Sequence, residues 1–333
     1  MIPRRIHFVY VGGRTFSFIH FLAVYTAWKV NRPDCIYFHH TEVPTGQWWD
    51  KARAYLTLHR VEPVREVHGN PITYPAHMAD VIRLEMLQRF GGIYLDLDIV
   101  SLRPFAPFLQ HEFVMGMEPG TGLCNAVVMA RQEAQFLSLW REQYRSFDGS
   151  LWNHHSVVLP WQMAQDNPQL IHVADKYAFF YPTHNDPVHR YLWGERPTLR
   201  ERAMRLAKNL LRLAAEPFGG RRDAIRQAYY RTFHALRGRE WHYRRACQSY
   251  CLHLWEGLWG EPYLKAVTPD YLRNSSSNFA RLLRGVLSMA ELDAMKLPSP
   301  MRAAAPLTPV QGDDFPGASG LAAVSPAPTF SMR

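Results

Sequence analysis

The chain has 333 residues, of which 47% are hydrophobic and 13% aromatic, so it can hold one large α/β domain with an elaboration or two domains. Its four cysteines are too few for a disulfide scaffold, no apolar run reaches the roughly 18 residues of a membrane span, and the first residues predict a strand rather than a signal peptide. We therefore expect a cytoplasmic protein with reduced thiols, whose net charge of +9 comes from one segment.

The first part of the chain alternates strands and helices. Residues 6–11 predict a buried strand that ends at Gly12-Gly13, residues 18–30 a helix, and residues 35–39 a second strand. A strand–helix–strand unit favours a parallel sheet with a right-handed crossover. Glycines at the end of the first strand let the backbone approach a ligand closely. The sequence therefore predicts an α/β fold with a central, mostly parallel sheet.

The residues most suited to chemistry follow the third predicted strand. Residues 76–90 predict a helix, the glycines at 91 and 92 end it, and residues 93–95 predict a short buried strand. Asp96 and Asp98 come next, where ligands of open α/β sheets bind. Two carboxylates beside an apolar run repel each other unless water or a cation separates them. Mg²⁺ and Mn²⁺ favour carboxylate oxygens and substrate phosphates, so the pattern indicates a metal-bound diphosphate or, alternatively, two solvated acids in a turn.

Asp80 and Arg83 lie three residues apart and therefore share a face of the preceding helix. One interpretation is an ordinary ion pair within the helix. The other places Arg83 against a phosphate or sugar oxygen and Asp80 against a sugar hydroxyl.

Further along, residues 113–117 and 123–130 predict strands, with Asn125 near the start of the second, and residues 132–147 predict an amphipathic helix. Residues 195–245 contain 14 Lys or Arg against 5 Asp or Glu, an excess equal to the net charge of the chain. Apolar residues at helical spacing there predict a basic helical hairpin. It could contact an anionic membrane from the cytoplasmic side, hold an acidic acceptor, or pack on the core with a solvated basic face.

Three motifs occur in an order that resembles one enzyme group. Residues 79–84 (ADVIRL) and 91–98 (GGIYLDLD) resemble the signature of glycosyltransferases with a DXD sugar-binding region. This family-32-like group includes capsular-polysaccharide and alpha-hexosyltransferases and, more distantly, the glucosyltransferase domain of the large clostridial toxins. Residues 2–13 resemble its first strand and residues 251–259 its closing motif.

The resemblance implies a GT-A-type, Rossmann-like sandwich. The nucleotide-sugar-binding core would occupy residues 1–193, the basic helical insertion residues 194–245, and the C-terminal part of the core residues 246–296. The Pro/Ala-rich composition of residues 297–333 predicts a disordered tail. Residues 177–182 resemble a family strand that ends in Tyr-Pro.

The resemblance also implies a set of site residues. A Mn²⁺ or Mg²⁺ ion would be held by Asp96, Asp98 and His253, although His253 could instead be a packed core histidine. Catalytic roles are implied for Asp80, Arg83, Asp98 and Asn125. Contacts to the nucleotide-sugar donor are implied for Val9, Tyr10, Gly12, Asp80, Arg83, Asp96, Trp255 and Trp259. Tyr10 could instead be a core aromatic, and Asn125 a turn residue. Leu258 stands where relatives often have Ser.

The expected reaction is metal-dependent transfer of a hexose from a nucleotide sugar, such as a UDP-hexose, to a glycan, a lipid-linked glycan or a protein. The resemblance implies retention of configuration, and front-face attack assisted by the leaving phosphate is our hypothesis. One alternative is a haloacid-dehalogenase-like phosphatase with Asp96 as nucleophile. The late position of the motif in the chain argues against this alternative. The other is a basic membrane- or nucleic-acid-binding module, which leaves the neutral remainder unexplained. We expect no specific nucleic-acid partner.

Overall fold

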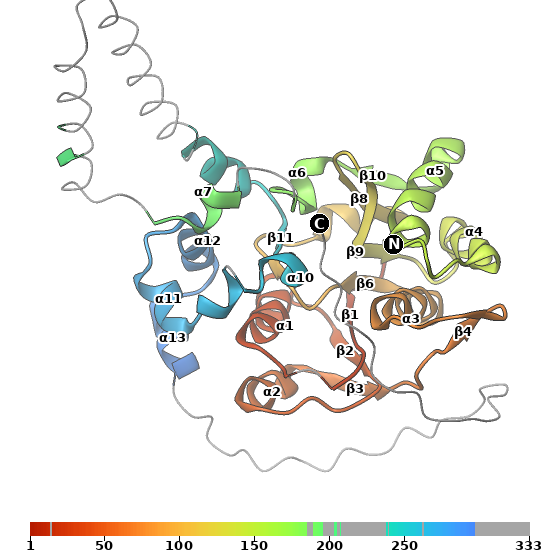
Figure 1. Cartoon of the computed structure of the whole chain (residues 1–333), viewed down its shortest axis with the longest axis horizontal. Coiled ribbons are helices and arrows are strands. Elements are labelled where there is room, and N and C mark those ends of the chain that lie inside the picture. Colours follow the sequence, from red (N-terminus) through yellow and green to blue (C-terminus); the bar gives the residue numbers. More distant parts are fainter. Residues whose placement is uncertain are drawn as a thin grey trace, which may run out of the picture. The chain divides into compact units, whose positions relative to one another are not determined.

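A seven-stranded mixed sheet forms the centre of the fold, in the order β10-β8-β9-β6-β1-β2-β3 (Figure 1). The computed structural model describes residues 1–13, 15–184, 189–195, 240–261 and 263–296, with isolated positions at 203, 204, 207 and 238. Most of the predicted basic insertion and the whole predicted tail lie outside these residues. The strands of the sheet are β1 (Arg5–Tyr10), β2 (Cys35–His40), β3 (Thr57–Arg60), β6 (Gly92–Leu95), β8 (Phe113–Glu118), β9 (Gly122–Ala130) and β10 (His172–Ala174).

The mostly parallel arrangement predicted from the sequence is confirmed. β1 pairs in parallel with β2 and β6, β2 with β3, and β8 with β10, whereas β9 runs antiparallel to both β6 and β8. The carboxyl ends of β1, β2, β6 and β8 therefore meet at one edge of the sheet, together with the start of β9. Two small antiparallel pairs lie outside it. They are β4 (Glu66–Val67) with β5 (Asn70–Pro71), and β7 (Ile99–Ser101) with β11 (Cys251–His253).

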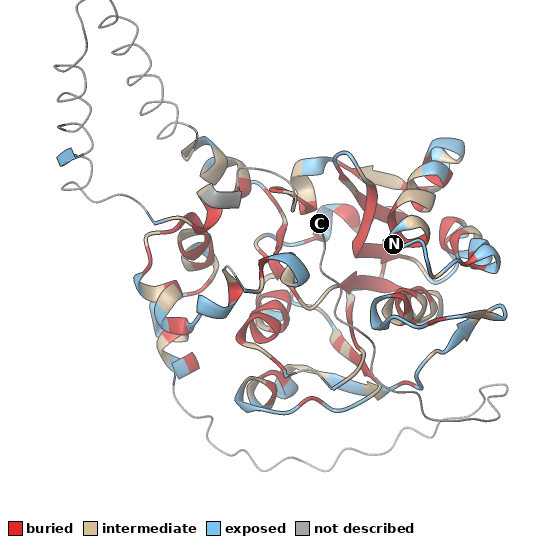
Figure 2. Cartoon of the chain, in the orientation of Figure 1, coloured by how far each residue is buried: buried red, intermediate tan, exposed pale blue. Residues whose placement is uncertain are grey.

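Helices cover both faces of the sheet, and each face has its own apolar core (Figure 1). α1 (Phe18–Asn31) and α2 (Gln47–Ala52) lie on one face; α3 (Pro75–Phe90), α4 (Gln135–Gln143) and α5 (Leu159–Asp166) lie on the other. Figure 2 shows the buried residues concentrated in the strands and on the sides of these helices that face them. The remaining described helices are α6 (Lys176–Phe179), α7 (His189–Trp193), α10 (Glu256–Trp259), α11 (Pro269–Asn274), α12 (Asn278–Val286) and α13 (Met289–Lys296).

The glycine pair after α3 fixes how the chain enters β6. Gly91 ends the helix with φ +58, and Gly92 begins the strand with φ +121, both in the region that favours glycine. A Cβ on Gly92 would lie 2.5 Å from the carbonyl oxygen of Arg5 on β1. The predicted helix stop is therefore also the place where β6 approaches β1 closely.

Two expected elements differ from the structure. The predicted helix over residues 132–147 is shorter, because the chain turns at 131–134 and tightens to a 3₁₀ turn at Tyr144–Ser146. The strand suggested for residues 177–182 is wrong. Asp175 accepts a hydrogen bond from the backbone N–H of Tyr177 and thereby caps the one-turn helix α6.

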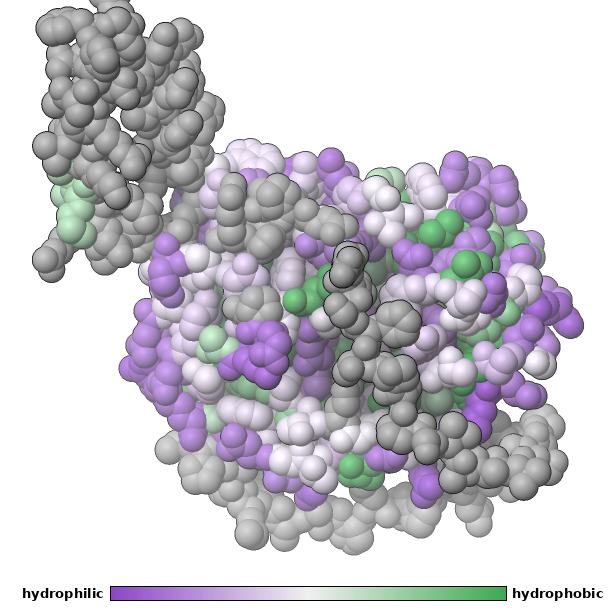
Figure 3. All heavy atoms as spheres, in the orientation of Figure 1, coloured by the Kyte–Doolittle hydropathy of each residue, from purple (hydrophilic) through white to green (hydrophobic). Residues whose placement is uncertain are grey.

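Most of the visible surface is polar. On the face in Figure 3, hydrophobic side chains occur in small separate groups among hydrophilic ones. Among the described residues, none of the helices has both the length and the apolar character of a membrane-spanning segment.

A partly buried carboxylate joins α13 to α1, and its environment predicts a pH-dependent stability. Glu291 accepts hydrogen bonds from Lys29 Nζ at 2.6 Å, Tyr25 Oη at 2.7 Å and the backbone N–H of Ser288 at 2.7 Å. Burial raises the pKa of Glu291, but these donors outweigh it and lower the pKa from 4.5 to about 2. A depressed pKa in the folded state stabilises the protein above pH 4.5, and the contribution is lost as the pH falls towards 2.

We therefore expect Glu291→Gln to lower the free energy of unfolding by about 2 kcal/mol at pH 7, after allowance for solvent screening. Urea unfolding should show the difference from wild type shrinking as the pH falls below 4.5. Glu133→Gln, at an exposed position, serves as the control and should change little. A difference that stays constant between pH 7 and pH 3 would contradict the assignment.

Candidate active site

The two aspartates follow β6 at the sheet edge where the carboxyl ends of the strands meet. The backbone N–H of Asp96 donates to the carbonyl of Ala126 at 2.9 Å, which extends the pairing of β6 with β9. Residues of a strand alternate between faces, so Leu95 enters the core on the α1 side while Tyr94 and Asp96 face α3. A turn at 96–99 then carries the chain into β7 and brings Asp98 back towards α10.

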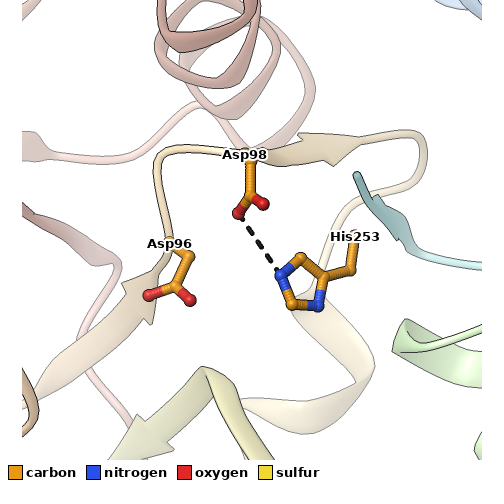
Figure 4. A group of neighbouring side chains, drawn as sticks. All are labelled: Asp96, Asp98 and His253. Atoms are coloured by element: carbon orange, nitrogen blue, oxygen red, sulfur yellow. Dashed lines mark ion pairs between the residues drawn. The ribbon is translucent and has the colours of Figure 1, made fainter. Parts of the chain in front are cut away.

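His253 reaches the aspartates because β11 pairs with β7. The register places His253 opposite Ile99, one residue after Asp98. His253 Nε2 lies 3.4 Å from Asp98 Oδ1, and both aspartate side chains point into the same space as the imidazole (Figure 4). One ligand atom from each of Asp96, Asp98 and His253 lies within 4.8 Å of the others.

This donor set fits a divalent cation. Ligands about 2.1 Å from an octahedral ion are about 3 Å apart when adjacent and about 4 Å apart when opposite, which small side-chain adjustments at this cluster can reach. Two carboxylates and one imidazole suit Mn²⁺ in particular, because an imidazole nitrogen is a softer ligand than Mg²⁺ prefers. The structure thus brings together the three residues that the sequence analysis grouped, and their role as ligands stays a prediction.

The backbone around residue 255 holds Asp98 in place. The N–H of Leu254 donates to the backbone carbonyl of Asp98 at 3.0 Å, and the N–H of Glu256 donates to Asp98 Oδ2 at 2.8 Å. Burial raises the pKa of Asp98, but His253 and the Glu256 N–H outweigh it, so the pKa lies below its usual value. Burial lowers the pKa of His253, and Asp98 outweighs that effect and raises it. Each of the two side chains therefore favours the charged form of the other.

Arg83 links α3 to the strands on the other side of the aspartates. Its Nη2 lies 3.1 Å from Asp80 Oδ1 and 3.4 Å from Asp96 Oδ1, and its Nη1 donates to the carbonyl of Asn125 at 2.6 Å. Its guanidinium carbon lies 4.3 Å from the centre of the Tyr94 ring. The Asp80–Arg83 pair is therefore more than a contact within one helix, because it fixes α3 against both β6 and β9.

The carboxylates around Arg83 are themselves hydrogen-bonded. Asn125 Nδ2 donates to Asp80 Oδ1 at 2.7 Å, and the Tyr94 hydroxyl donates to Asp96 Oδ1 at 2.6 Å. Burial raises the pKa of Asp80, although Arg83 and Asn125 oppose the effect. Burial lowers the pKa of Arg83, but Tyr94 and the two aspartates outweigh it and raise the pKa above its usual value. A fixed positive charge thus lies directly beside Asp96.

Of the donor contacts predicted at the end of β1, Gly12 lies where a ligand could approach, whereas the side chains of Val9 and Tyr10 are buried. Gly12, with φ +83, donates its N–H to Thr41 Oγ1 at 3.1 Å and lies at the same sheet edge as Asp96. Val9 is buried on the α3 side. The Tyr10 side chain, however, is 1% exposed, and its ring centre lies 5.8 Å from that of Phe38, on which it stacks. The prediction that this ring stacks on a nucleotide base is therefore wrong. The core-aromatic interpretation of Tyr10 fits instead.

The two tryptophans of the closing motif also differ. The Trp255 ring lies beside the cluster, 3.8 Å from the His253 ring centre. Trp259 is 4% exposed and packs edge-on against Trp193, so a donor contact from this side chain is not supported. Sequence reasoning missed Tyr94, Glu118, His184 and Glu256. Only the alternation along β6, which puts Tyr94 on the face of Asp96, offered a signal for any of them.

Comparisons with known proteins identify the proteins to which this chain is similar. Residues 24–115 match the glycosyltransferase sugar-binding region containing the DXD motif. The chain is 29% identical over 302 residues to "Glucan organizing enzyme 1" of Cryptococcus neoformans var. grubii, covering 85% of this chain and 70% of that protein. It is 27% identical over 119 residues to mouse "Lactosylceramide 4-alpha-galactosyltransferase", covering 35% of this chain and 28% of that enzyme. Among solved structures, the PaToxG glycosyltransferase aligns at 18% identity with a TM-score of 0.34, covering 50% of this chain and 70% of that one.

The protein is a glycosyltransferase that carries the DXD-containing sugar-binding region. The aspartates of that motif are Asp96 and Asp98, and a sugar donor and an acceptor are implied by this class of enzyme.

Proposed function

We propose that the protein transfers a hexose from a nucleotide sugar, most simply a UDP-hexose, in a reaction that needs Mn²⁺ or Mg²⁺. The observation that carries the proposal is the convergence of Asp96, Asp98 and His253 within 4.8 Å at the sheet edge. The names of the two relatives, one a glucan organizing enzyme and one an alpha-galactosyltransferase, support a hexose as the transferred group.

Different groups around the aspartates would bind different parts of the donor. When bound, the divalent ion would neutralise negative charge on the departing nucleoside diphosphate. Arg83 fixes Asp96 from the α3 side and adds a permanent positive charge near the leaving group. Asp80 and Asn125, held by Arg83 and by each other, offer oxygen and amide groups suited to sugar hydroxyls. The Gly12 backbone leaves room for the nucleoside at the end of β1, because no atom of the described residues, apart from those of its chain neighbours, lies within 4 Å of the Cβ position there.

Two features of the reaction belong to the proposal. The acceptor is a glycan, a lipid-linked glycan or a protein. The configuration is retained, through attack on the face from which the diphosphate departs. The anomeric configuration of the first product, followed by proton NMR before mutarotation, tests the second feature, and an inverted product would exclude it.

Thermal denaturation with a panel of nucleotide sugars tests the donor and the metal together. We expect one UDP-hexose to stabilise the protein in the presence of Mn²⁺ and not in EDTA. At a donor concentration of about 100 times Kd the gain should be about 2.7 kcal/mol, or a few degrees in Tm. Stabilisation by every nucleotide sugar without metal, or rapid hydrolysis of p-nitrophenyl phosphate, would exclude the proposal and favour a phosphatase.

A further inference from the structure

A buried carboxylate outside the cluster lies at the same edge of the sheet. Glu118 is the last residue of β8, and the antiparallel pairing of β8 with β9 puts it opposite Gly122, at the end of β9 where Asn125 lies. Its side chain is 4% exposed, and it contacts His184, whose Nδ1 lies 3.1 Å from Glu118 Oε1. A carboxylate that is so deeply buried is costly unless a cation or a hydrogen-bond donor accompanies it.

A row of rings connects this pair to the aspartate cluster. The His184 ring centre lies 5.0 Å from the Trp255 ring, which in turn lies 3.8 Å from the His253 ring. Trp255 Nε1 donates to the carbonyl of Pro182 at 3.4 Å. The pair formed by Glu118 and His184 is thus one aromatic ring away from His253.

The backbone conformation of Trp255 is strained, and it determines where the indole ring lies. Trp255 has φ +48, in the left-handed region that costs an L-residue about 1–2 kcal/mol. The flanking N–H groups of Leu254 and Glu256 both bond to Asp98, which imposes this conformation. The same contacts that position Asp98 therefore aim the indole at the space beside the cluster.

These groups have the chemistry of a sugar-binding subsite. An indole offers an apolar face against which the C–H face of a pyranose packs, and an imidazole beside a carboxylate can accept a hydrogen bond from a hydroxyl or donate one to it. The His184 side chain is 24% exposed, so a ligand can reach it. Glu118 is 4% exposed and would act on the ligand only through His184. Donor-binding groups are already provided on the α3 side by Arg83, Asp80 and Asn125.

We propose that His184, oriented by Glu118, and Trp255 form the subsite for the acceptor, and that this acceptor presents a pyranose ring. The inference rests on the proposed function, because it takes the α3 side of the cluster as the donor side. Glu118 is a positioning residue in this scheme, and His184 and Trp255 touch the acceptor. The proposal thereby assigns Trp255 to the acceptor rather than to the donor contact that the resemblance implied.

The test compares transfer with hydrolysis of the same donor. The full chain is supplied with Mn²⁺, the UDP-hexose that stabilises it, and methyl α- and β-glycosides of glucose, galactose and mannose. Release of UDP in water alone reports the donor site, and the glycoside-dependent increase reports the acceptor site. Glu118→Gln and His184→Gln are compared with Glu112→Gln and His111→Gln, which lie just before the first residue of β8.

We expect both test variants to lose at least tenfold in glycoside-dependent kcat/KM while donor hydrolysis and donor KM stay within twofold of wild type. The control variants should match wild type in every measurement. Saturation-transfer NMR should show glycoside binding to wild type and to His111→Gln but not to His184→Gln. Because the side chain of His184 is 24% exposed, we expect His184→Gln to fold.

Unchanged glycoside dependence in both test variants, or an equal loss of hydrolysis and transfer, overturns the subsite. So does a wild-type enzyme that hydrolyses the donor but neither binds nor uses any of the glycosides. Absence of metal-dependent hydrolysis and of donor binding in wild type overturns the proposed function itself, which is a separate result.

Discussion

Replacing Asp98 with Asn should reduce metal-dependent UDP release from the donor by about a thousandfold. The substitution removes one negative charge from the cluster but keeps an oxygen that can accept the Glu256 N–H, so the local backbone is retained. His253 loses the ion pair that raises its pKa, and the donor set loses one of its two carboxylates. Rates measured over a range of Mn²⁺ concentrations check the expectation.

A metal-binding role for Asp98 predicts a second, independent result for the Asp98→Asn variant. The donor should no longer stabilise Asp98→Asn in Mn²⁺ at concentrations that saturate wild type, although Tm without ligand changes by only a few degrees. Asp34→Asn, at an exposed position on the loop before β2, is the control and should behave like wild type. Near-normal turnover by Asp98→Asn would remove the metal cluster from the mechanism.

The sequence was most informative where local chemistry and strand geometry coincide. The apolar run before Asp96, the glycines that end α3 and the alternation of strands and helices sufficed to place both aspartates at the carboxyl end of a buried strand. The shared face of Asp80 and Arg83 followed from helical spacing alone. These features depend on residues close together in the chain, which is why periodicity and turn propensity reveal them.

Contacts between distant segments were less accessible. Residue spacing could not show that β11 pairs with β7, so His253 entered only through a resemblance, and Glu118 and His184 were not noticed. Tyr10 and Trp259 illustrate the opposite error, because an aromatic residue inside a recognised motif was assigned to the ligand although packing places both rings in the core. Which face of an element a bulky ring occupies is decided by its tertiary neighbours, and those are absent from the local sequence.

Arg83→Met should be the most destabilising of the substitutions considered, by about 3–5 kcal/mol. Methionine fills a similar volume but leaves the buried carboxylate of Asp80 without its cation. It also frees the carbonyl of Asn125 and the ring of Tyr94, which the guanidinium joins to α3. Asp96 is affected less in stability because 29% of its side chain is exposed and water can solvate it. Urea unfolding of the apo protein measures the loss, and Arg89→Met, exposed on the same helix, is the control.

A double variant separates the structural role of Arg83 from its catalytic role. Asp80→Asn combined with Arg83→Met leaves no unpaired charge at this position, and Asn125 can still donate to the new amide oxygen, so about 1–3 kcal/mol of stability should return. Turnover should not return, because the positive charge beside the leaving diphosphate is still missing. If the double variant recovers both stability and turnover, Arg83 serves only to neutralise Asp80, and the transition-state charge must be stabilised elsewhere. If it recovers neither, the loss arises from packing around Tyr94 rather than from the buried carboxylate.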